Sequence, residues 1–238
     1  MPRLQEFLSR VFTGRRRLKA EQLAKMTPRS VFESIYERNG WKGTESVSGL
    51  GSDREQTARI VAELPRVLRE LGARSLLDIP CGDFYWMRHV DLDGIEYVGA
   101  DIVEDLVRGN EAFASESRSF VSCDLLTDAL PSVDAIFCRD CLVHFSNHHV
   151  WQALRNIARS DAKYLITTSF TDRGNEKQIV TGQWRPLNLQ ADPFCLPAPC
   201  QWIDEQCTQD NGAYPDKMLG VWSAQAVREV CERSQLAA

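Results

Sequence analysis

The chain has 238 residues, of which 43% are hydrophobic and 26% are charged. This length is enough for one large α/β domain with a substantial core, and the composition is that of a soluble globular protein. The formal net charge of −5 argues against a dedicated nucleic-acid binder. The charge is uneven: eight Lys and Arg against two Glu give residues 1–30 a charge of +6, which leaves −11 for the remainder.

The first 18 residues carry an amphipathic helical pattern. Its apolar side chains share one face: Leu4, Phe7, Leu8, Val11 and Phe12. Such a helix either packs on the domain or lies on an anionic membrane or a partner, so a peripheral membrane contact through residues 1–18 stays open. The sequence shows no secretory signal, no apolar stretch near the ~20 residues that span a bilayer, and eight scattered cysteines. We therefore expect a cytoplasmic protein with reduced thiols.

Two helices separated by a Gly- and Ser-rich loop are predicted within residues 28–72. Ser30 is expected to cap the first helix, and Ser52 or Asp53 the second. Pro65 lies inside the second helix and predicts a kink or a restart there.

From residue 75 onward, short apolar runs alternate with helical patterns. The predicted strands span residues 75–79, 96–101, 119–123, 134–138, 164–169, 201–207 and 218–223. The predicted helices between them span residues 103–114 and 148–159. This spacing indicates a doubly wound, mostly parallel α/β sheet. We interpret residues 1–72 as N-terminal helices with a lid or substrate loop, and residues 73–238 as the main domain of one compact unit.

Residues 171–199 interrupt this alternation with a polar segment that contains four prolines. An irregular segment of this length in a compact domain is usually functional. The two strand-like runs that follow it flank Asp210-Asn211-Gly212, and they predict a terminal hairpin.

The first predicted strand ends in the turn Asp78–Asp83, with the sequence D-I-P-C-G-D. A glycine at such a turn lets the backbone approach a ligand, and the next helix start offers free N–H groups. Only Gly82 is present, so the G-x-G-x-x-G fingerprint of a nicotinamide oxidoreductase is missing. Asp101 lies 23 residues after Asp78 and ends the second strand, where an acid binds ribose hydroxyls in doubly wound sheets.

Polar residues also follow the third and fourth strands. Asp124 is placed to accept a hydrogen bond from an exocyclic adenine amine, and the segment Arg139–His144 emerges where open sheets bind ligands. Cys138 and Cys141 form a C-x-x-C pair, but a zinc site needs four ligands and no second pair exists. Both thiols are expected to line a core or pocket wall, and no metal is expected.

These features, in this order, resemble the core of the class I S-adenosylmethionine-dependent methyltransferases. The resemblance implies a seven-stranded Rossmann-like sheet of order 3-2-1-4-5-7-6 and S-adenosylmethionine as cofactor. It also implies the cofactor-binding residues Asp78, Pro80, Cys81, Gly82, Asp83, Asp101, Ile102, Asp124, Leu125 and Arg139. Pro80 and Cys81 replace glycines common in the family, and Pro80 removes one N–H donor. Contact to the cofactor carboxylate is therefore expected near Asp83 or from Arg139.

His144 is the predicted general base, because an imidazole pKa near ~6.5 suits proton removal at neutral pH. Asp140 is expected to orient it if the turn between them is helical. In the alternative interpretation, His144 packs against or caps the next helix. Trp41, Trp184 and Arg185 lie in irregular segments and are predicted to contact substrate, although tryptophans also anchor loops.

We therefore predict methyl transfer to the hydroxyl of a small molecule or glycan. N-methylation of a metabolite or peptide is the alternative reaction. A non-catalytic binding domain that keeps the fold is the alternative from another class. The acidic chain has no evident basic groove, so nucleic acid is not expected as a partner.

Overall fold

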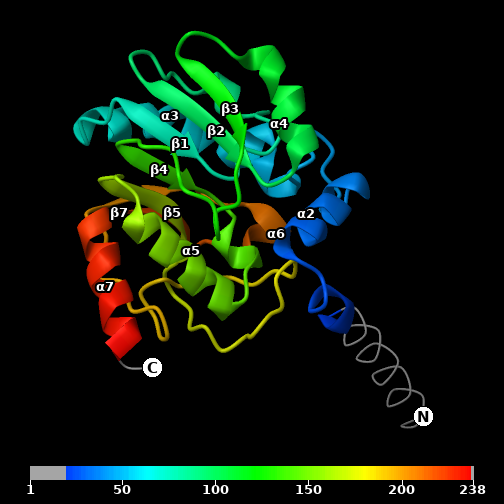
Figure 1. Ribbon diagram of the computed structural model, residues 1–238, viewed down its shortest axis with the longest axis vertical. Helices are drawn as coiled ribbons and strands as arrows, with labels where there is room; N and C mark the ends of the chain where they lie inside the picture. Colours follow the sequence, from blue (N-terminus) through cyan, green and yellow to red (C-terminus); the bar gives the residue numbers. More distant parts are fainter. Residues whose placement is uncertain (1–19, 237–238) are drawn as a thin grey trace.

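The computed structural model describes residues 20–236, so the amphipathic pattern of residues 1–18 lies outside it. A seven-stranded sheet lies between helices on its two faces (Figure 1). Its order, β3-β2-β1-β4-β5-β7-β6, confirms the predicted topology. The strands are β1 (Ser75–Asp78), β2 (Glu96–Asp101), β3 (Arg118–Ser122), β4 (Ala135–Cys138), β5 (Tyr164–Phe170), β6 (Gln201–Asp204) and β7 (Lys217–Ser223). The helices are α2 (Pro28–Glu37), α3 (Arg54–Glu70), α4 (Glu104–Asn110), α5 (Asn147–Arg159), α6 (Gln209–Gly212) and α7 (Ala224–Leu236).

β1 lies in the middle of the sheet and is parallel to both neighbours. Leu77 pairs with Val98 on β2 and with Ile136 on β4. β5 continues the parallel part, whereas β7 runs antiparallel to β5 and to β6. As a result, the carboxyl ends of β1 to β5 and the beginning of β7 meet at one edge of the sheet.

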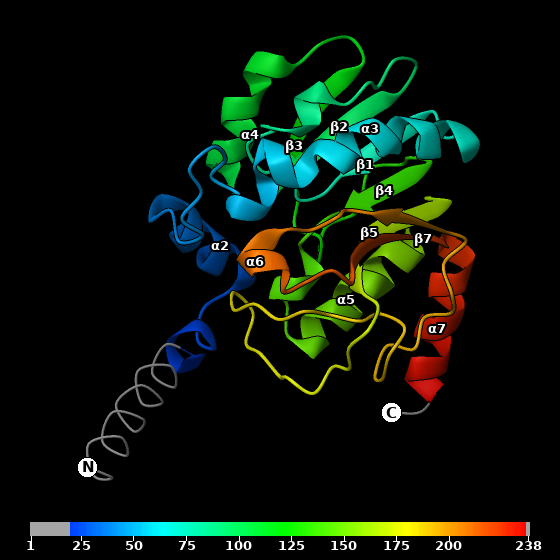
Figure 2. The same ribbon diagram turned by 180° about the vertical axis from the view of Figure 1, so that it is seen from behind.

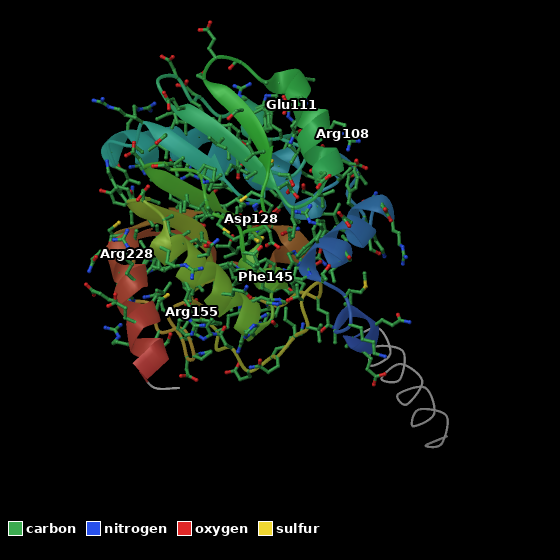
Figure 3. All side chains as sticks on the ribbon, viewed as in Figure 1. Arg108, Glu111, Asp128, Phe145, Arg155 and Arg228 are labelled. Atoms are coloured by element: carbon green, nitrogen blue, oxygen red, sulfur yellow. The ribbon has the colours of Figure 1, made fainter. Side chains whose placement is uncertain are left out.

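Alternate residues of β1 face two separate apolar cores. Leu76 packs with α3 residues such as Ile60 on one face. Leu77 packs with α5 residues such as Leu154 on the other face, where α7 also lies. Burial on both faces explains why the strand reads as an uninterrupted apolar run. Charged side chains such as Arg108 on α4 point away from these cores (Figure 3).

The N-terminal helices differ from the sequence prediction at their caps. Thr27, not Ser30, caps α2: its hydroxyl accepts a hydrogen bond from the Ser30 backbone N–H. Pro28 fits the first helical position because an N–H group there would have no acceptor within the helix, so its absence costs no hydrogen bond. Asp53 is the residue before α3, as expected, but its side chain makes no capping hydrogen bond. The helix continues through Pro65 without restarting. Pro65 is buried, so packing of the apolar face holds the helix together there.

The C-terminal part contains two helices that the pattern did not predict. The predicted pairing of β6 with β7 is confirmed, but the short helix α6 occupies the connection. Asp210 and Asn211 adopt left-handed backbone angles there, with φ of 49° and 58°. α7 follows β7 and packs against α5. Figure 2 shows α6 beside α2, although the two are far apart in the sequence. No helix among residues 20–236 is long and apolar enough to cross a membrane.

Candidate functional site

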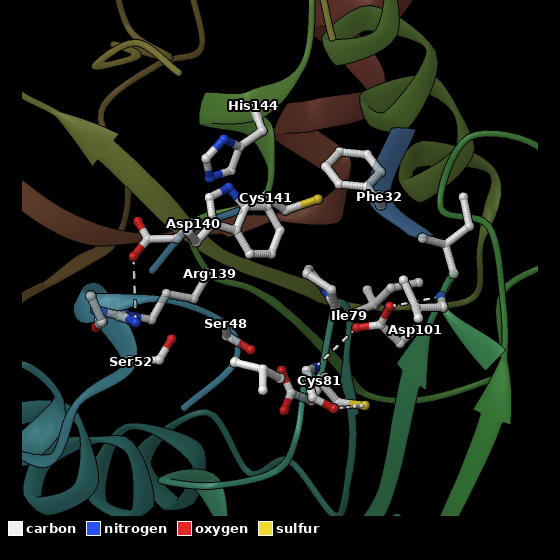
Figure 4. A pocket seen from close by; sticks show the side chains of 18 of the residues that line it. Phe32, Ser48, Ser52, Ile79, Cys81, Asp101, Arg139, Asp140, Cys141 and His144 are labelled. Atoms are coloured by element: carbon white, nitrogen blue, oxygen red, sulfur yellow. Dashed lines mark hydrogen bonds and ion pairs between the residues drawn. The ribbon is translucent and has the colours of Figure 1, made fainter. Parts of the chain in front are cut away.

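A cavity of about 350 Å³ lies at the edge of the sheet where the parallel strands end. Its floor comes from the turns after β1, β2, β3 and β4. Residues from Pro28 to Ser52 form its roof, and residues from Phe170 to Lys217 form a further wall. Figure 4 shows the inward convergence of these segments. The volume falls within the range of small-molecule sites.

The turn after β1 is held by the acid that ends β2. The Gly82 N–H donates to Oδ2 of Asp101 over 3.0 Å, and the Val103 N–H donates to Oδ1 over 2.9 Å. Gly82 has φ of +55°, a left-handed angle that favours glycine. Burial raises the pKa of Asp101 to about 6, although the two backbone N–H groups stabilise its ionised form. Asp101 therefore presents a buried carboxylate to the cavity, and Ile102 lines the cavity beside it.

Asp78, at the end of β1, is also buried and lines the cavity. Its Oδ2 accepts a hydrogen bond of 2.7 Å from the Tyr97 hydroxyl. Burial raises the pKa of Asp78 to about 7, and the hydrogen bond from Tyr97 opposes that rise. Pro80 and Cys81 line the cavity directly.

Asp83 does not line the cavity, in contrast to the sequence prediction. Its carboxylate instead accepts hydrogen bonds from the Ser46 hydroxyl at 2.8 Å and from the Val47 N–H at 3.0 Å. This contact fixes the roof segment directly above the turn. A Cβ atom on Gly82 would lie 2.2 Å from the Ser48 hydroxyl oxygen, so the roof closes tightly over this glycine.

Asp124 follows β3 and lines the cavity together with Leu125. One of its carboxylate oxygens, Oδ1, accepts a hydrogen bond of 2.8 Å from the Leu126 N–H, which fixes the turn. The predicted acids at the ends of β2 and β3 thus reach the same cavity.

Arg139 follows β4 and belongs to a buried charged cluster. Its Nη2 donates to Glu205 Oε2 at 2.7 Å and to the Gly51 carbonyl oxygen at 2.9 Å. The guanidinium therefore links the floor, the segment after β6 and the roof. The second carboxylate oxygen of Glu205, Oε1, is buried and has no hydrogen-bond partner.

Asp140 pairs with cations and does not contact His144, which corrects the predicted orienting role. Its Oδ2 lies 2.6 Å from Lys217 Nζ and 3.4 Å from Arg139 Nη1; the latter pair is drawn in Figure 4. Burial alone would raise the pKa of Asp140, but the ammonium of Lys217 and the guanidinium of Arg139 hold it well below its usual range. Asp140 therefore stays ionised, beside the group expected to act as a base.

His144 is oriented by a backbone carbonyl group from the long loop. Its Nδ1 lies 3.0 Å from the Gln183 carbonyl oxygen. Burial lowers the pKa of His144, although this carbonyl and the Asp140 carboxylate favour its protonated form. The imidazole lines the cavity and stacks at a tilt on Trp41, with 5.2 Å between ring centroids.

Two of the three predicted substrate residues line the cavity: Trp41 in the roof and Trp184 in the wall after β5. Arg185 does not, and its predicted substrate contact is wrong. Its side chain is fully buried, and it donates to the Phe145 carbonyl oxygen at 2.6 Å and to Asn147 Oδ1 at 2.7 Å. Arg185 thus ties the long loop to the start of α5.

Sequence reasoning missed several residues of the cavity, of which Lys217 is the most consequential. Lys217 is the first residue of β7, 77 positions after Asp140. The predicted topology could have placed Lys217 at the cavity, because an antiparallel β7 must begin at the edge of the sheet where β4 and β5 end. The aromatic residues Phe32, Tyr36 and Tyr214 were missed because no spacing rule links the segments that carry them.

The chain was compared with known proteins. Residues 77–161 match the family model described as a methyltransferase domain. No curated protein sequence matches the chain.

Solved structures share its fold. Human N-acetylserotonin methyltransferase in complex with S-adenosylmethionine (SAM) superposes with a TM-score of 0.55 at 14% identity, over 83% of this chain. The chain spans only 60% of that protein's length. The methyltransferase domain of bacterial CtHen1 superposes with a TM-score of 0.51 at 11% identity, over 71% of this chain and 99% of that domain.

The matched residues 77–161 include the strands and turns that build the cavity floor. The strand order, with a single antiparallel hairpin at its end, is that of the structural relatives. Residues 77–161 therefore match a methyltransferase domain, and the chain as a whole has the fold of the SAM-dependent methyltransferases on which it superposes.

Proposed function

We propose that this methyltransferase transfers the methyl group of SAM to a hydroxyl group of a small molecule, with His144 as the general base. The hydrogen bond between His144 and the Gln183 carbonyl group carries this proposal, because it determines which ring nitrogen is available.

The donor set of the cavity fits a nucleoside cofactor. Asp101 offers a buried carboxylate to the ribose hydroxyls, and Asp124 with Leu125 offers an acceptor and an apolar contact to the adenine. The amino-acid end of SAM would be held by Arg139 and by the roof hydroxyl groups of Ser48 and Ser52, which line the same cavity. When bound, SAM supplies the electrophilic methyl group.

The His144 imidazole is poised to accept a proton from a ligand. A carbonyl oxygen can only accept a hydrogen bond, so Nδ1 carries the hydrogen in the contact with Gln183. In the neutral imidazole, Nε2 then has a free lone pair. The lowered pKa keeps His144 neutral at pH 7. These are the properties that a general base for a hydroxyl group requires.

The roof covers the site and is held at several points. Asp83 holds the roof at Ser46 and Val47, and Arg139 holds it at Gly51. We propose that residues 1–72 supply N-terminal helices and a lid or substrate loop, while residues 73–238 form the methyltransferase domain. Closing the site strengthens its electrostatic interactions and protects the reacting groups.

Two measurements test this function. Calorimetry should show binding of SAM and of its product S-adenosylhomocysteine (SAH), but not of NAD. Transfer of a labelled methyl group should fall about 10²–10⁴-fold in His144→Ala, while SAH affinity changes less than about twofold. His148→Ala, on the exposed side of α5, is the matched control and should keep full turnover. Full turnover in His144→Ala would refute the role of His144, and SAH binding without any turnover would favour a non-catalytic domain.

A further inference from the structure

Aromatic rings from separate parts of the chain line the cavity, and we take the part that they line as the acceptor side. The rings that line it are Phe32, Tyr36, Trp41, Phe145, Phe170, Trp184 and Tyr214. Most are only half-buried although they face the interior of a cavity. Partly exposed aromatic surface of this kind is a binding surface for an apolar partner.

Six of these aromatic side chains and His144 form groups in which the rings contact one another. Phe170, Trp184 and Tyr214 pack edge-to-face, with centroid distances of 5.1 to 6.2 Å. Trp41 packs against Phe32 at 6.3 Å and against His144 at 5.2 Å. Because the rings within each group pack on one another, both groups present aromatic faces that suit a planar ligand.

Two charged side chains that line this side, Lys217 and Asp140, are already paired with each other. Lys217 Nζ lies 2.6 Å from Asp140 Oδ2 and 3.2 Å from Glu205 Oε2. The other carboxylate oxygen of Asp140, Oδ1, accepts a hydrogen bond from the Thr168 hydroxyl at 3.3 Å. A glycan needs hydrogen-bond partners for many hydroxyl groups, and the Lys217–Asp140 pair offers it fewer than two unpaired side chains would.

We propose that the methyl acceptor is an aryl hydroxyl, a phenol-type group whose ring lies against Trp41, Trp184 and Tyr214 while its O–H points to Nε2 of His144. This inference rests on the proposed function and narrows its substrate class. In the reaction, the O–H bond breaks and its proton goes to Nε2. The oxygen bonds to the methyl carbon as the carbon–sulfur bond breaks, and that electron pair remains on the sulfur. The products are an aryl methyl ether and a neutral thioether.

Acid strength supports the same class of acceptor. Burial lowers the pKa of His144, which makes its imidazole a weaker base. A phenol has a pKa of about 10, as in tyrosine, whereas alkyl hydroxyl groups are far weaker acids. Only a relatively acidic hydroxyl can pass its proton to a weakened imidazole at a modest energetic cost.

The experiment uses the full chain loaded with saturating SAH, and calorimetry with 2-naphthol, 2-naphthylamine and methyl α-glucoside as probes. We expect 2-naphthol to bind and methyl α-glucoside not to bind. Trp41→Leu and Trp184→Leu should each weaken 2-naphthol binding about tenfold and change SAH affinity less than about twofold. Trp151→Leu is the matched control: Trp151 packs on Phe194 outside the cavity and its loss should leave both affinities unchanged.

Methyl transfer from labelled SAM to the same probes completes the test, with 2-naphthol expected to be methylated on oxygen. Equal binding of 2-naphthol and the glucoside, or unchanged 2-naphthol affinity in both tryptophan variants, would overturn the aryl assignment. Methylation of 2-naphthylamine in place of 2-naphthol would overturn the hydroxyl assignment. Absence of SAH binding is a separate outcome, which would refute the proposed function itself.

Discussion

The contact between Asp83 and the roof makes a quantitative prediction about cofactor affinity. Asp83→Ala removes the acceptor for the Ser46 hydroxyl at 2.8 Å and for the Val47 N–H at 3.0 Å. A hydrogen bond to a charged group contributes about 1.5–3 kcal/mol, and Ser46 is only 2% exposed, so water replaces its lost partner poorly. Arg139 still holds the roof at Gly51. We therefore assign about 2 kcal/mol to the loss, or roughly 30-fold in roof closure.

The assay is calorimetry with SAH and with 5′-methylthioadenosine, which has the nucleoside but not the amino-acid end. If the roof covers the amino-acid end, Asp83→Ala should weaken SAH binding by up to about 30-fold. The affinity for 5′-methylthioadenosine should change by less than about twofold. The control is Asp93→Ala, which removes an exposed carboxylate just before β2. An SAH affinity within twofold of the parent, in a variant with unchanged thermal stability, would refute the reasoning.

Three further changes probe other parts of the site. Gly82→Ala should weaken SAH binding and destabilise the turn by about 1–2 kcal/mol, because its Cβ would lie 2.2 Å from the Ser48 hydroxyl oxygen at φ of +55°; urea unfolding and calorimetry measure both. Burial raises the pKa of Asp101 from 3.8 to about 6, so the folded protein holds this proton more tightly than the unfolded chain does. The stabilisation of the folded state that results is lost as the pH rises through about 6. If ionised Asp101 binds the ribose as proposed, SAH binding should strengthen over the same range and should not vary with pH in Asp101→Asn. Arg185→Leu leaves the Phe145 carbonyl group without its donor and should lower the free energy of unfolding by roughly 2–4 kcal/mol; unchanged urea stability would contradict this.

The parallel part of the sheet was predictable because its strands are buried on both faces. A run such as Leu76-Leu77 before a Gly- and Pro-containing turn has few other interpretations. The acids Asp101 and Asp124 could be placed for a related reason, because strand ends determine where side chains emerge. The capping residue of α2 was harder to predict, because Thr27 and Ser30 are both good capping residues by type.

The roles of long-range partners could not be read from the sequence. Asp83 belongs to the right turn, but its partner Ser46 lies 37 residues earlier and takes its carboxylate away from the cavity. Arg185 sits in a polar segment that looks exposed, yet it is fully buried among backbone acceptors. Both outcomes depend on tertiary packing, which side-chain chemistry alone does not determine.

Different segments of the chain form the floor and the aromatic wall of the cavity, and this separation bears on how substrate choice can evolve. The floor lies within residues 77–161, the stretch that matches the methyltransferase domain. Most of the aromatic wall comes from α2, Trp41 and the segment between β5 and β7. Under the proposed function, mutations there would alter acceptor choice one ring at a time, while the strand ends proposed to hold the nucleoside stay untouched. A single scaffold can thereby be diverted to new acceptors without first losing its methyl donor.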